Sequence, residues 1–384
     1  MSLSNEDTLR LNVLLANNID AIRIDESRMA VHGLTGEDEA RVQLHPNCRA
    51  EQYARQVRAF LSSHVLGSPG GYPVYLKRWT RMGQAKDESL ADLLMLGEPE
   101  AVVAVACAPG LTDELARRVW WIGQDAENAR RMLENKNIIN GAMGKILAEF
   151  LVEFLPFETE PDTILRSVRL VLEPGLIDQD ARMQIWNKGA SKNVYRIGFL
   201  ETVPDDLPEK KPAHAGYASK RDLLIPLVKN ENAMAILLNR ILNGSGQSFI
   251  HASYNILKRP TSQEAVSALL NAIGKYFSVG SSGGISSGTS ENMLSRDINE
   301  VIDIARTQCE FPPEPLAELI STMPDLQQEI SAMCVLAQVN SELVVPVFSR
   351  STAMGSLMRK QIAPVISPVL EQLATLQSGN RAWP

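Results

Sequence analysis

The chain has 384 residues, more than the roughly 250–300 at which a single hydrophobic core usually stops growing, so we expect two or three structural units. Hydrophobic residues make up 45% of the chain and charged residues 22%, a balance that excludes an intrinsically disordered protein. The net charge of -7 excludes a general binder of nucleic acids or anionic membranes, because such proteins need a broad cationic surface.

No apolar stretch approaches the roughly 20 residues needed to span a bilayer. The best stretch, AVVAVACAPGL from Ala101, is interrupted by Pro109 and Gly110. The N-terminal sequence MSLSNEDTLRLNVLL is acidic where a secretory signal would be basic. We therefore expect a cytoplasmic protein without membrane insertion.

The four cysteines, Cys48, Cys107, Cys309 and Cys334, lie far apart and form no CxxC pair, which indicates reduced thiols. Cys107 closes the apolar run and is expected to be a small buried hydrophobe. Cys309 precedes Glu310, whose negative charge is expected to raise the pKa of the thiol. Neither Cys107 nor Cys309 is predicted to be reactive.

The N-terminal part of the chain predicts a helix followed by a small sheet. Ser4 and Asp7 suit the start of a helix that reaches Leu15. Three short segments that alternate or mix apolar and polar residues then predict an antiparallel β meander. These segments are IDAIRI from Ile19, MAVHGL from Met29 and ARVQL from Ala40. Helical spacing returns at Arg49 and ends before Gly67.

Beyond a Gly/Pro-rich loop that ends near Gly83, apolar spacing predicts helices almost throughout. The expected helices are Glu88–Leu96, Glu98–Ala108, Thr112–Ile122, Asp125–Leu133, Ala142–Leu155, Pro161–Leu172, Asp178–Lys188, several from Lys220 onward, Glu291–Thr307, Pro313–Thr322, Leu326–Gln338 and Met354–Gln377. Pro364 and Pro368 are expected to interrupt the last of these.

Composition predicts where the chain divides. The proline-rich segment VPDDLPEKKPAHAGY is the best candidate linker, and GSSGGISSGTS from Gly280 predicts a flexible loop at 278–290. We expect a small α+β unit at 1–84, a helical domain at 85–203, a linker at 204–217 and a helical domain at 218–384. The fold class is mainly α, with the meander followed by an irregular multi-helix bundle or solenoid-like array.

The segment HVLGSPGGYPVYLKRWTRMG, residues 64–83, is the strongest candidate binding site. Between Arg49 and Lys86 there are seven Lys or Arg against one acid, Glu51. A Gly/Pro backbone with cations and aromatic rings is typical of a surface that binds an anion or a partner. The predicted binding residues are Gly70, Gly71, Tyr72, Lys77, Arg78, Trp79 and Arg81. The alternative is an ordered Ω-type connection with buried rings and solvated cations.

The other motifs in the sequence do not predict a cofactor-binding, catalytic or metal site. The chain contains neither GxxxxGK[ST] nor GxGxxG, so no cofactor is expected. Gly280–Gly284 matches GxSxG, but the polar sequence around it lacks the strand and helix that present a serine nucleophile. His32, His45, Cys48 and His64 make only one close ligand pair, so no metal site is predicted. No catalytic residue is assigned.

Two further pairs of neighbouring residues can be explained without a catalytic site. Trp120 and Trp121 follow two arginines in one helix and point about 100° apart, so one ring suits the core while the other is free to reach a partner. Asp205 and Asp206 lie in the expected linker without an apolar pocket, which argues against general acid–base catalysis.

Several strings resemble those of the sulfur-reduction protein DsrS family, named from the dissimilatory sulfite reductase gene cluster of sulfur-oxidising bacteria. They are residues 61–83 and then ESLADLLMLGEPEAVVAV, GLTDELARRVWW, NARRMLE, LAEFLVEFLPFE, SVRLVLEPGLID and KNVYRIGFLE. The resemblance covers roughly the first 200 residues closely and the remainder loosely. It implies a cytoplasmic accessory to the oxidation of stored sulfur through reverse-acting sulfite reductase, and it transfers no catalytic residue.

We therefore expect a cytoplasmic accessory or regulatory protein of dissimilatory sulfur oxidation that binds a protein partner of that system or a small anion. One alternative is an enzyme of sulfur or nucleotide metabolism with an anionic substrate at the same loop. A weaker alternative is an RNA-binding post-transcriptional regulator that uses the Arg49–Lys86 patch, although the net charge argues against nucleic acid.

Overall fold

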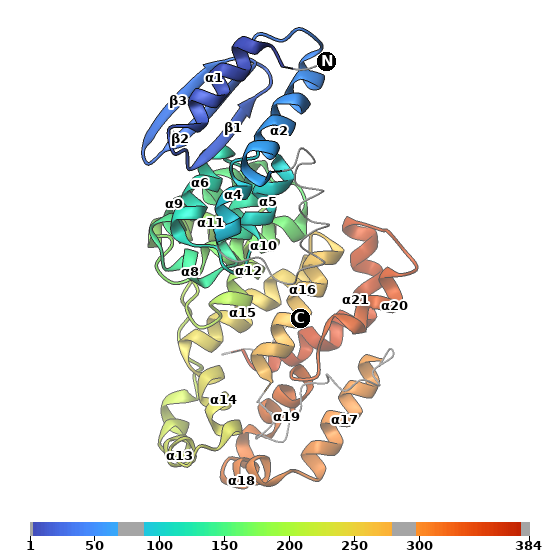
Figure 1. The fold of residues 1–384 in the computed structure, drawn as a ribbon. Helices are drawn as coiled ribbons and strands as arrows, with labels where there is room; N and C mark the ends of the chain where they lie inside the picture. The colour runs from blue at the N-terminus through green and yellow to red at the C-terminus, as the bar shows by residue number, and fades with distance from the viewer. Residues whose placement is uncertain (1–2, 68–87, 279–296, 378–384) are drawn as a thin grey trace. The chain divides into compact units, whose positions relative to one another are not determined.

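The computed structural model describes residues 3–67, 88–278 and 297–377 (Figure 1). The chain is mainly α-helical and carries a three-stranded antiparallel sheet near the N-terminus, which confirms the predicted fold class. It divides into two compact units. The first comprises Met1–Pro156 and Glu173–Ile177, and the second comprises Phe157–Leu172 and Asp178–Pro384.

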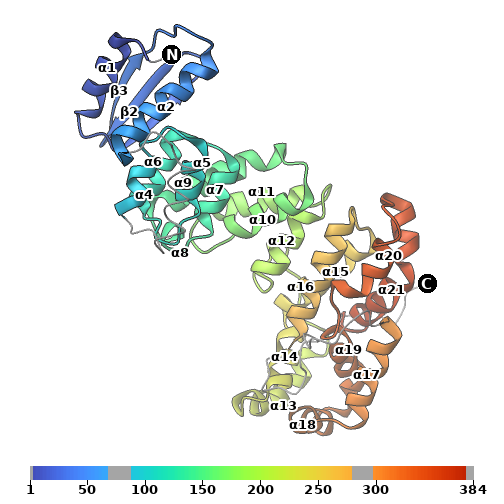
Figure 2. The same cartoon turned by 45° about the vertical axis from the view of Figure 1, so that its right-hand side comes forward.

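The first unit begins with the predicted helix and meander. Its elements are α1 (Asn5–Leu15), β1 (Ala21–Asp25), β2 (Ala30–Thr35), β3 (Asp38–Gln43) and α2 (Ala50–Leu66). The strands pair in the order β1-β2-β3, with Ile22 opposite Gly33 and Gly33 opposite Ala40. Helices α1 and α2 lie against the sheet (Figure 2). Apolar side chains of the two helices and of the sheet are buried between them, as the alternation along the strands requires.

The remainder of the first unit is a cluster of short helices. They are α4 (Glu88–Leu93), α5 (Pro99–Ala106), α6 (Asp113–Ile122), α7 (Ala126–Leu133), α8 (Lys136–Ile139) and α9 (Ala142–Phe154), followed by the 3₁₀ turn η1 (Leu155–Phe157). Side-chain caps fix the N-terminal ends of α6 and α7. The Thr112 side chain accepts a hydrogen bond from the N–H of Leu115, and the Asp125 side chain accepts one from the N–H of Asn128. Trp120 packs edge-on against Phe150 with ring centroids 4.8 Å apart, which joins α6 to α9.

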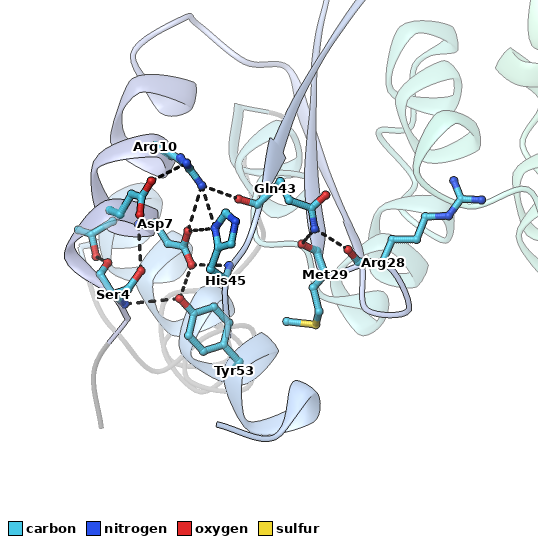
Figure 3. Close-up of polar contacts among 10 residues, drawn as sticks. Ser4, Asp7, Arg10, Arg28, Met29, Gln43, His45 and Tyr53 are labelled. Carbon is cyan, nitrogen blue, oxygen red and sulfur yellow. Dashed lines mark hydrogen bonds and ion pairs between the residues drawn. The ribbon is translucent and has the colours of Figure 1, made fainter. Parts of the chain in front are cut away.

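A buried carboxylate ties α1 to α2 (Figure 3). Asp7 is fully buried and accepts the Tyr53 hydroxyl at 2.5 Å and the backbone N–H of His45 at 2.8 Å, both at Oδ2. Its own N–H is capped by the Ser4 hydroxyl at 3.1 Å, and the Arg10 guanidinium lies 3.7 Å from Oδ1. These contacts satisfy a charge that would otherwise be costly inside the core.

The second unit is entirely helical in the residues that the structure describes. Its elements are α10 (Pro161–Val171), α11 (Gln179–Lys188), α12 (Val194–Thr202), α13 (Tyr217–Lys229), α14 (Ala233–Leu242), α15 (Gly244–Lys258), α16 (Gln263–Phe277), α17 (Ile298–Glu310), α18 (Glu314–Thr322), η2 (Pro324–Leu326), α19 (Gln327–Leu336), η3 (Ser341–Val344), α20 (Val345–Phe348) and α21 (Gly355–Thr375).

The predicted linker is packed within the second unit. Asp205 pairs with Arg240 at 2.6 Å and accepts the Tyr276 hydroxyl at 2.9 Å, while Leu207 is buried. The Arg240 guanidinium lies 3.9 Å from the centre of the Tyr276 ring. The observed division at residues 156–178 therefore differs from the predicted boundaries at 85, 204 and 218, because side chains of α14 and α16 anchor the proline-rich segment.

The expected interruption of the last helix is wrong. Helix α21 runs from Gly355 to Thr375 through both Pro364 and Pro368. The prolines are four residues apart and lie on the opposite side from the buried stripe that contains Ile362, Ile366 and Val369. The carbonyl groups that lack an N–H donor because of the prolines are exposed to water, so the helix continues.

Within the described residues no single helix is long and apolar enough to cross a membrane. One bent pair, Pro324–Leu336 with Ser341–Phe348, passes the same length and composition test at an angle of 76°.

We predict that Asp7→Ala destabilises the first unit by about 2–4 kcal/mol at pH 7, because the Tyr53 hydroxyl and the His45 N–H lose their acceptor. Burial raises the pKa of Asp7, but the hydrogen bonds from Tyr53 and His45 outweigh it and leave the pKa below its ordinary value of 3.8. The ionised group therefore stabilises the fold above that pH, and this contribution declines as pH falls below it.

Urea unfolding of wild type and variant between pH 3 and pH 8 measures this difference. The difference in unfolding free energy between wild type and Asp7→Ala should be constant near neutral pH and should become smaller in acid. Asp38→Ala, which removes an exposed carboxylate from β3, is the matched control and should change stability by less than about 0.5 kcal/mol. A difference in unfolding free energy that grows as pH falls would contradict the role assigned to the Asp7 charge.

Candidate functional site

The seven predicted binding residues lie outside the described residues. They are Gly70, Gly71, Tyr72, Lys77, Arg78, Trp79 and Arg81. Helix α2 ends at Leu66 before Gly67, whose φ of 63° is left-handed, and the next described element begins at Glu88. The binding loop therefore stays a prediction, and so does the flexible loop at 278–290, of which only its first residue is described.

Cys107 is solvent-exposed, so the prediction that it is buried is wrong. The buried stripe of α5 consists of Ala101, Val102, Val105 and Ala106, and Cys107 follows the helix on another side. Its Sγ lies 2.9 Å from Nη1 of Arg131, beside a polar cavity of about 360 Å³.

Two of the candidate ligand histidines, His32 and His45, have separate carboxylate partners. Nδ1 of His32 lies 2.5 Å from Oε1 of Glu39, and Nδ1 of His45 lies 3.5 Å from Oδ1 of Asp7. Across residues 3–67, 88–278 and 297–377, no three His, Cys, Asp or Glu side chains are grouped so that they could hold a metal ion.

A second cavity of the first unit lies beside β1 and measures about 560 Å³, within the usual range for small-molecule sites. Five segments that are distant in the chain form its wall. They are the end of β1 with its following turn (residues 22–27), Arg58 of α2, the start of α5 with the preceding turn (97–103), the end of α6 (122–123) and the start of α7 (125–128). The wall combines aliphatic side chains with a few charged ones.

The charged groups of the wall are held by other protein groups. Arg58 pairs with Glu26, and its Nε donates to the carbonyl of Gly97 at 3.1 Å. Asp25 accepts the hydroxyl of Ser27 at 2.6 Å and two backbone N–H groups, which together lower its pKa. These contacts fix the shape and charge of the wall before any ligand binds.

Asn128 supplies an unused acceptor beside the cavity. Its Nδ2 donates to Oδ2 of Asp125 at 2.5 Å, and its backbone N–H donates to Oδ1 of the same residue at 2.8 Å. Reversing the amide would place two oxygens together, so the orientation is fixed by the carboxylate. Oδ1 of Asn128 is buried and has no donor within the described part of the chain.

Trp121 joins α6 to the sheet next to the same cavity. The Arg23 guanidinium lies 4.8 Å from the centre of the Trp121 ring and donates to its carbonyl at 3.2 Å. Glu39 accepts from Trp121 Nε1 at 3.2 Å and from Arg23 at 3.3 Å. The second tryptophan thus contacts the protein's own sheet, whereas Trp120 enters the core. Sequence reasoning missed this contact because it joins residues 98 positions apart.

This arrangement is suited to binding. An apolar wall with a few oriented polar groups gives orientation and selectivity to a small ligand. The polar groups form pairs with one another, because Ser27 donates its hydroxyl to Asp25 and Arg58 pairs with Glu26. The described lining residues include no histidine, cysteine or lysine. The site therefore defines a class: a helical protein whose α+β unit holds a preformed polar–apolar cavity.

No family model, no curated protein and no solved structure matches the chain.

We predict that Gly97→Ala lowers the stability of the first unit by about 2 kcal/mol. Gly97 has φ of 63°, and an added Cβ would lie 2.6 Å from Cδ1 of Ile24 in the cavity wall. Thermal or urea unfolding measures the loss. Gly123→Ala is the matched control, because that glycine lines the same cavity with open space around its Cβ position. Equal losses in the two variants would contradict the assigned strain at Gly97.

Proposed function

We propose that this chain is a cytoplasmic accessory or regulatory protein of dissimilatory sulfur oxidation that acts by binding, and that the 560 Å³ cavity of the first unit is its ligand site. The proposal combines the sequence resemblance with the structure of the cavity wall. A protein partner of the sulfur-oxidation system remains the proposed target of the basic segment at residues 64–83.

One observation carries the proposal: two of the strings that resemble the DsrS family contribute to the cavity wall. ESLADLLMLGEPEAVVAV provides Gly97, Glu98, Pro99, Val102 and Val103, and NARRMLE begins at Asn128. The rest of the wall comes from β1 and its following turn, Arg58, residues 122–123 and Asp125.

The lining indicates the chemistry of the ligand. The charged part of the lining consists of four acids, Asp25, Glu26, Glu98 and Asp125, and two arginines, Arg23 and Arg58. The aliphatic part consists of Ile22, Ile24, Val102, Val103 and Ile122. A small molecule with hydrogen-bond donors and an apolar body matches this wall better than a small anion does.

We predict that Val103→Trp abolishes ligand binding while the fold is retained. Val103 is 36% exposed and lines the cavity, so an indole ring there fills space that a ligand would occupy. A panel of amino acids, polyamines and nucleosides should include a compound that raises the Tm of wild type. At 100 times its Kd, such a ligand stabilises the protein by about 2.7 kcal/mol.

Ile146→Trp is the matched control, because Ile146 is 46% exposed on α9 of the same unit and does not line the cavity. It should retain the full ligand-induced shift. A ligand that stabilises wild type and Val103→Trp equally binds elsewhere, and the cavity is then not its site.

The pathway part of the proposal has a separate test. Tagged protein should capture components of the sulfur-oxidation system from extract of its source organism grown on reduced sulfur, as identified by mass spectrometry. Arg78→Ala with Arg81→Ala should weaken this capture if the basic segment is the docking surface. Capture of the same proteins from extract of cells grown without reduced sulfur compounds would contradict a pathway-specific role.

A further inference from the structure

Strand β3 forms an exposed edge of the sheet in the first unit (Figure 1). Five of its six residues are exposed, and in the described part of the chain it pairs only with β2. The opposite edge, β1, is partly covered, because the N–H of Ile22 donates to the carbonyl of Leu94 at 2.9 Å. An exposed edge strand presents backbone groups to which a further strand can bind. The free edge of this sheet is therefore β3.

The register of β3 on β2 determines which of its backbone groups point outward. The N–H of Leu44 donates to the carbonyl of Met29 at 2.8 Å, as in a hydrogen-bonded pair. Hydrogen-bonded and non-hydrogen-bonded pairs alternate along an antiparallel ladder. Every second residue back from Leu44 therefore bonds to β2. The residues between them turn their N–H and C=O groups to the free edge, and these are Glu39, Arg41 and Gln43.

Two residues of this edge have unused backbone groups. In the described part of the chain, no group bonds to the N–H or the C=O of Glu39 or Arg41. The carbonyl of Gln43 is different, because Nη1 of Arg10 donates to it at 3.2 Å (Figure 3). The open edge is thus confined to the middle of β3 and is centred on Ala40.

The side chains of the open edge carry opposite charges on one face of the sheet. Val42 packs against the hydrophobic core, so Glu39 and Arg41, which alternate with it, lie on the opposite face. Glu39 pairs there with Arg23. Arg41 has no acidic partner among the described residues, and its Nη2 donates to Oε1 of Gln43 at 2.9 Å. A guanidinium without a counter-charge therefore lies two residues from a carboxylate.

We propose that β3 pairs with β3 of a second copy of this chain, so that two three-stranded sheets join into one sheet of six strands. The pairing is antiparallel and has its two-fold axis at Ala40. Glu39 of each copy then lies opposite Arg41 of the other. The two residues of such a pair exchange both N–H···O bonds, and symmetry repeats the pair. Opposite charges directly across the strands add to these backbone bonds.

Charge selects this register over its neighbours. A two-fold axis at Arg41 would place two guanidinium groups opposite each other and would set Glu39 against Gln43, whose carbonyl already binds Arg10. An axis at Glu39 would place two carboxylates opposite each other. Like charges directly opposite are destabilising. The axis at Ala40 avoids both conflicts and uses both open residues, so the edge is complementary to itself. This self-complementarity favours a second copy as the partner.

An apolar pair on α1 lies beside the same edge. Leu9 and Val13 are 65% and 58% exposed and are four residues apart on one side of the helix. Val13 follows Arg10 by three residues, and Arg10 reaches the edge of β3. The two-fold axis stands perpendicular to the sheet, so α1 of both copies lies on the same face of the six-stranded sheet. Pairing through β3 brings this apolar side of both helices to the interface, where its burial stabilises the dimer.

Sedimentation velocity of the full chain measures this association. The dimer fraction should rise between about 5 and 500 μM, because an interface of one strand pair and one helix pair is small. Arg41→Glu places a carboxylate opposite Glu39 in both pairs and should raise the Kd of the dimer by about tenfold or more. Lys145→Glu makes the same charge change at an exposed position of α9. It is the matched control and should leave the Kd unchanged.

Hydrogen exchange of single amides tests the contact itself. The amides of Glu39 and Arg41 have no acceptor within one copy, whereas that of Ala40 bonds to β2. In wild type, protection of the Glu39 and Arg41 amides should rise with protein concentration, while protection of Ala40 stays constant. Arg41→Pro removes an outward N–H without removing a bond to β2, and it should be monomeric.

A chain that stays monomeric over this range of concentration would overturn the proposal. A dimer whose Glu39 and Arg41 amides remain unprotected would do so as well, because its copies would meet at another surface. The exchange measurement on wild type needs no substitution, so it decides the question even if a variant misfolds.

Discussion

The carboxylate of Asp7 is the interaction on which the first unit depends. It gathers the Tyr53 hydroxyl of α2 and the N–H of His45, which follows β3, around the first turn of α1. Helices α1 and α2 are thereby held on one face of the sheet, and residues of β1 contribute to the wall of the cavity. An apolar residue in place of Asp7 would leave two buried donors without an acceptor, so this polar contact specifies the packing around it.

The polar groups around the cavity hold one another in place. Arg58 pairs with Glu26 and donates to the carbonyl of Gly97, and Asp25 accepts the Ser27 hydroxyl. Because these charges already have partners, the wall keeps its shape without a ligand. This arrangement favours reversible binding by a rigid site.

Local patterns in the sequence predicted the fold well. Alternation located the three strands within two or three residues, and helical spacing located most helices, because one-sided burial imposes both periods. The cavity could not be predicted, since Arg23, Arg58 and Asn128 meet only through tertiary contacts. The prediction that Glu310 raises the pKa of Cys309 is wrong for the same reason: the neighbour that contributes most to lowering this pKa, to about 7, is Cys334, which is remote in the chain. The predicted binding loop lies outside the described residues.

The prolines of α21 have a consequence for association. Pro364 and Pro368 lack an N–H, so the carbonyls of Lys360 and Pro364 have no donor four residues further on. Lys360 and Pro364 are exposed, which leaves these carbonyls to water. A second protein that covered this side with an apolar surface would have to strip that water without replacing it. The exposed side of α21 around the two prolines is therefore poorly suited to form a coiled-coil seam with another helix.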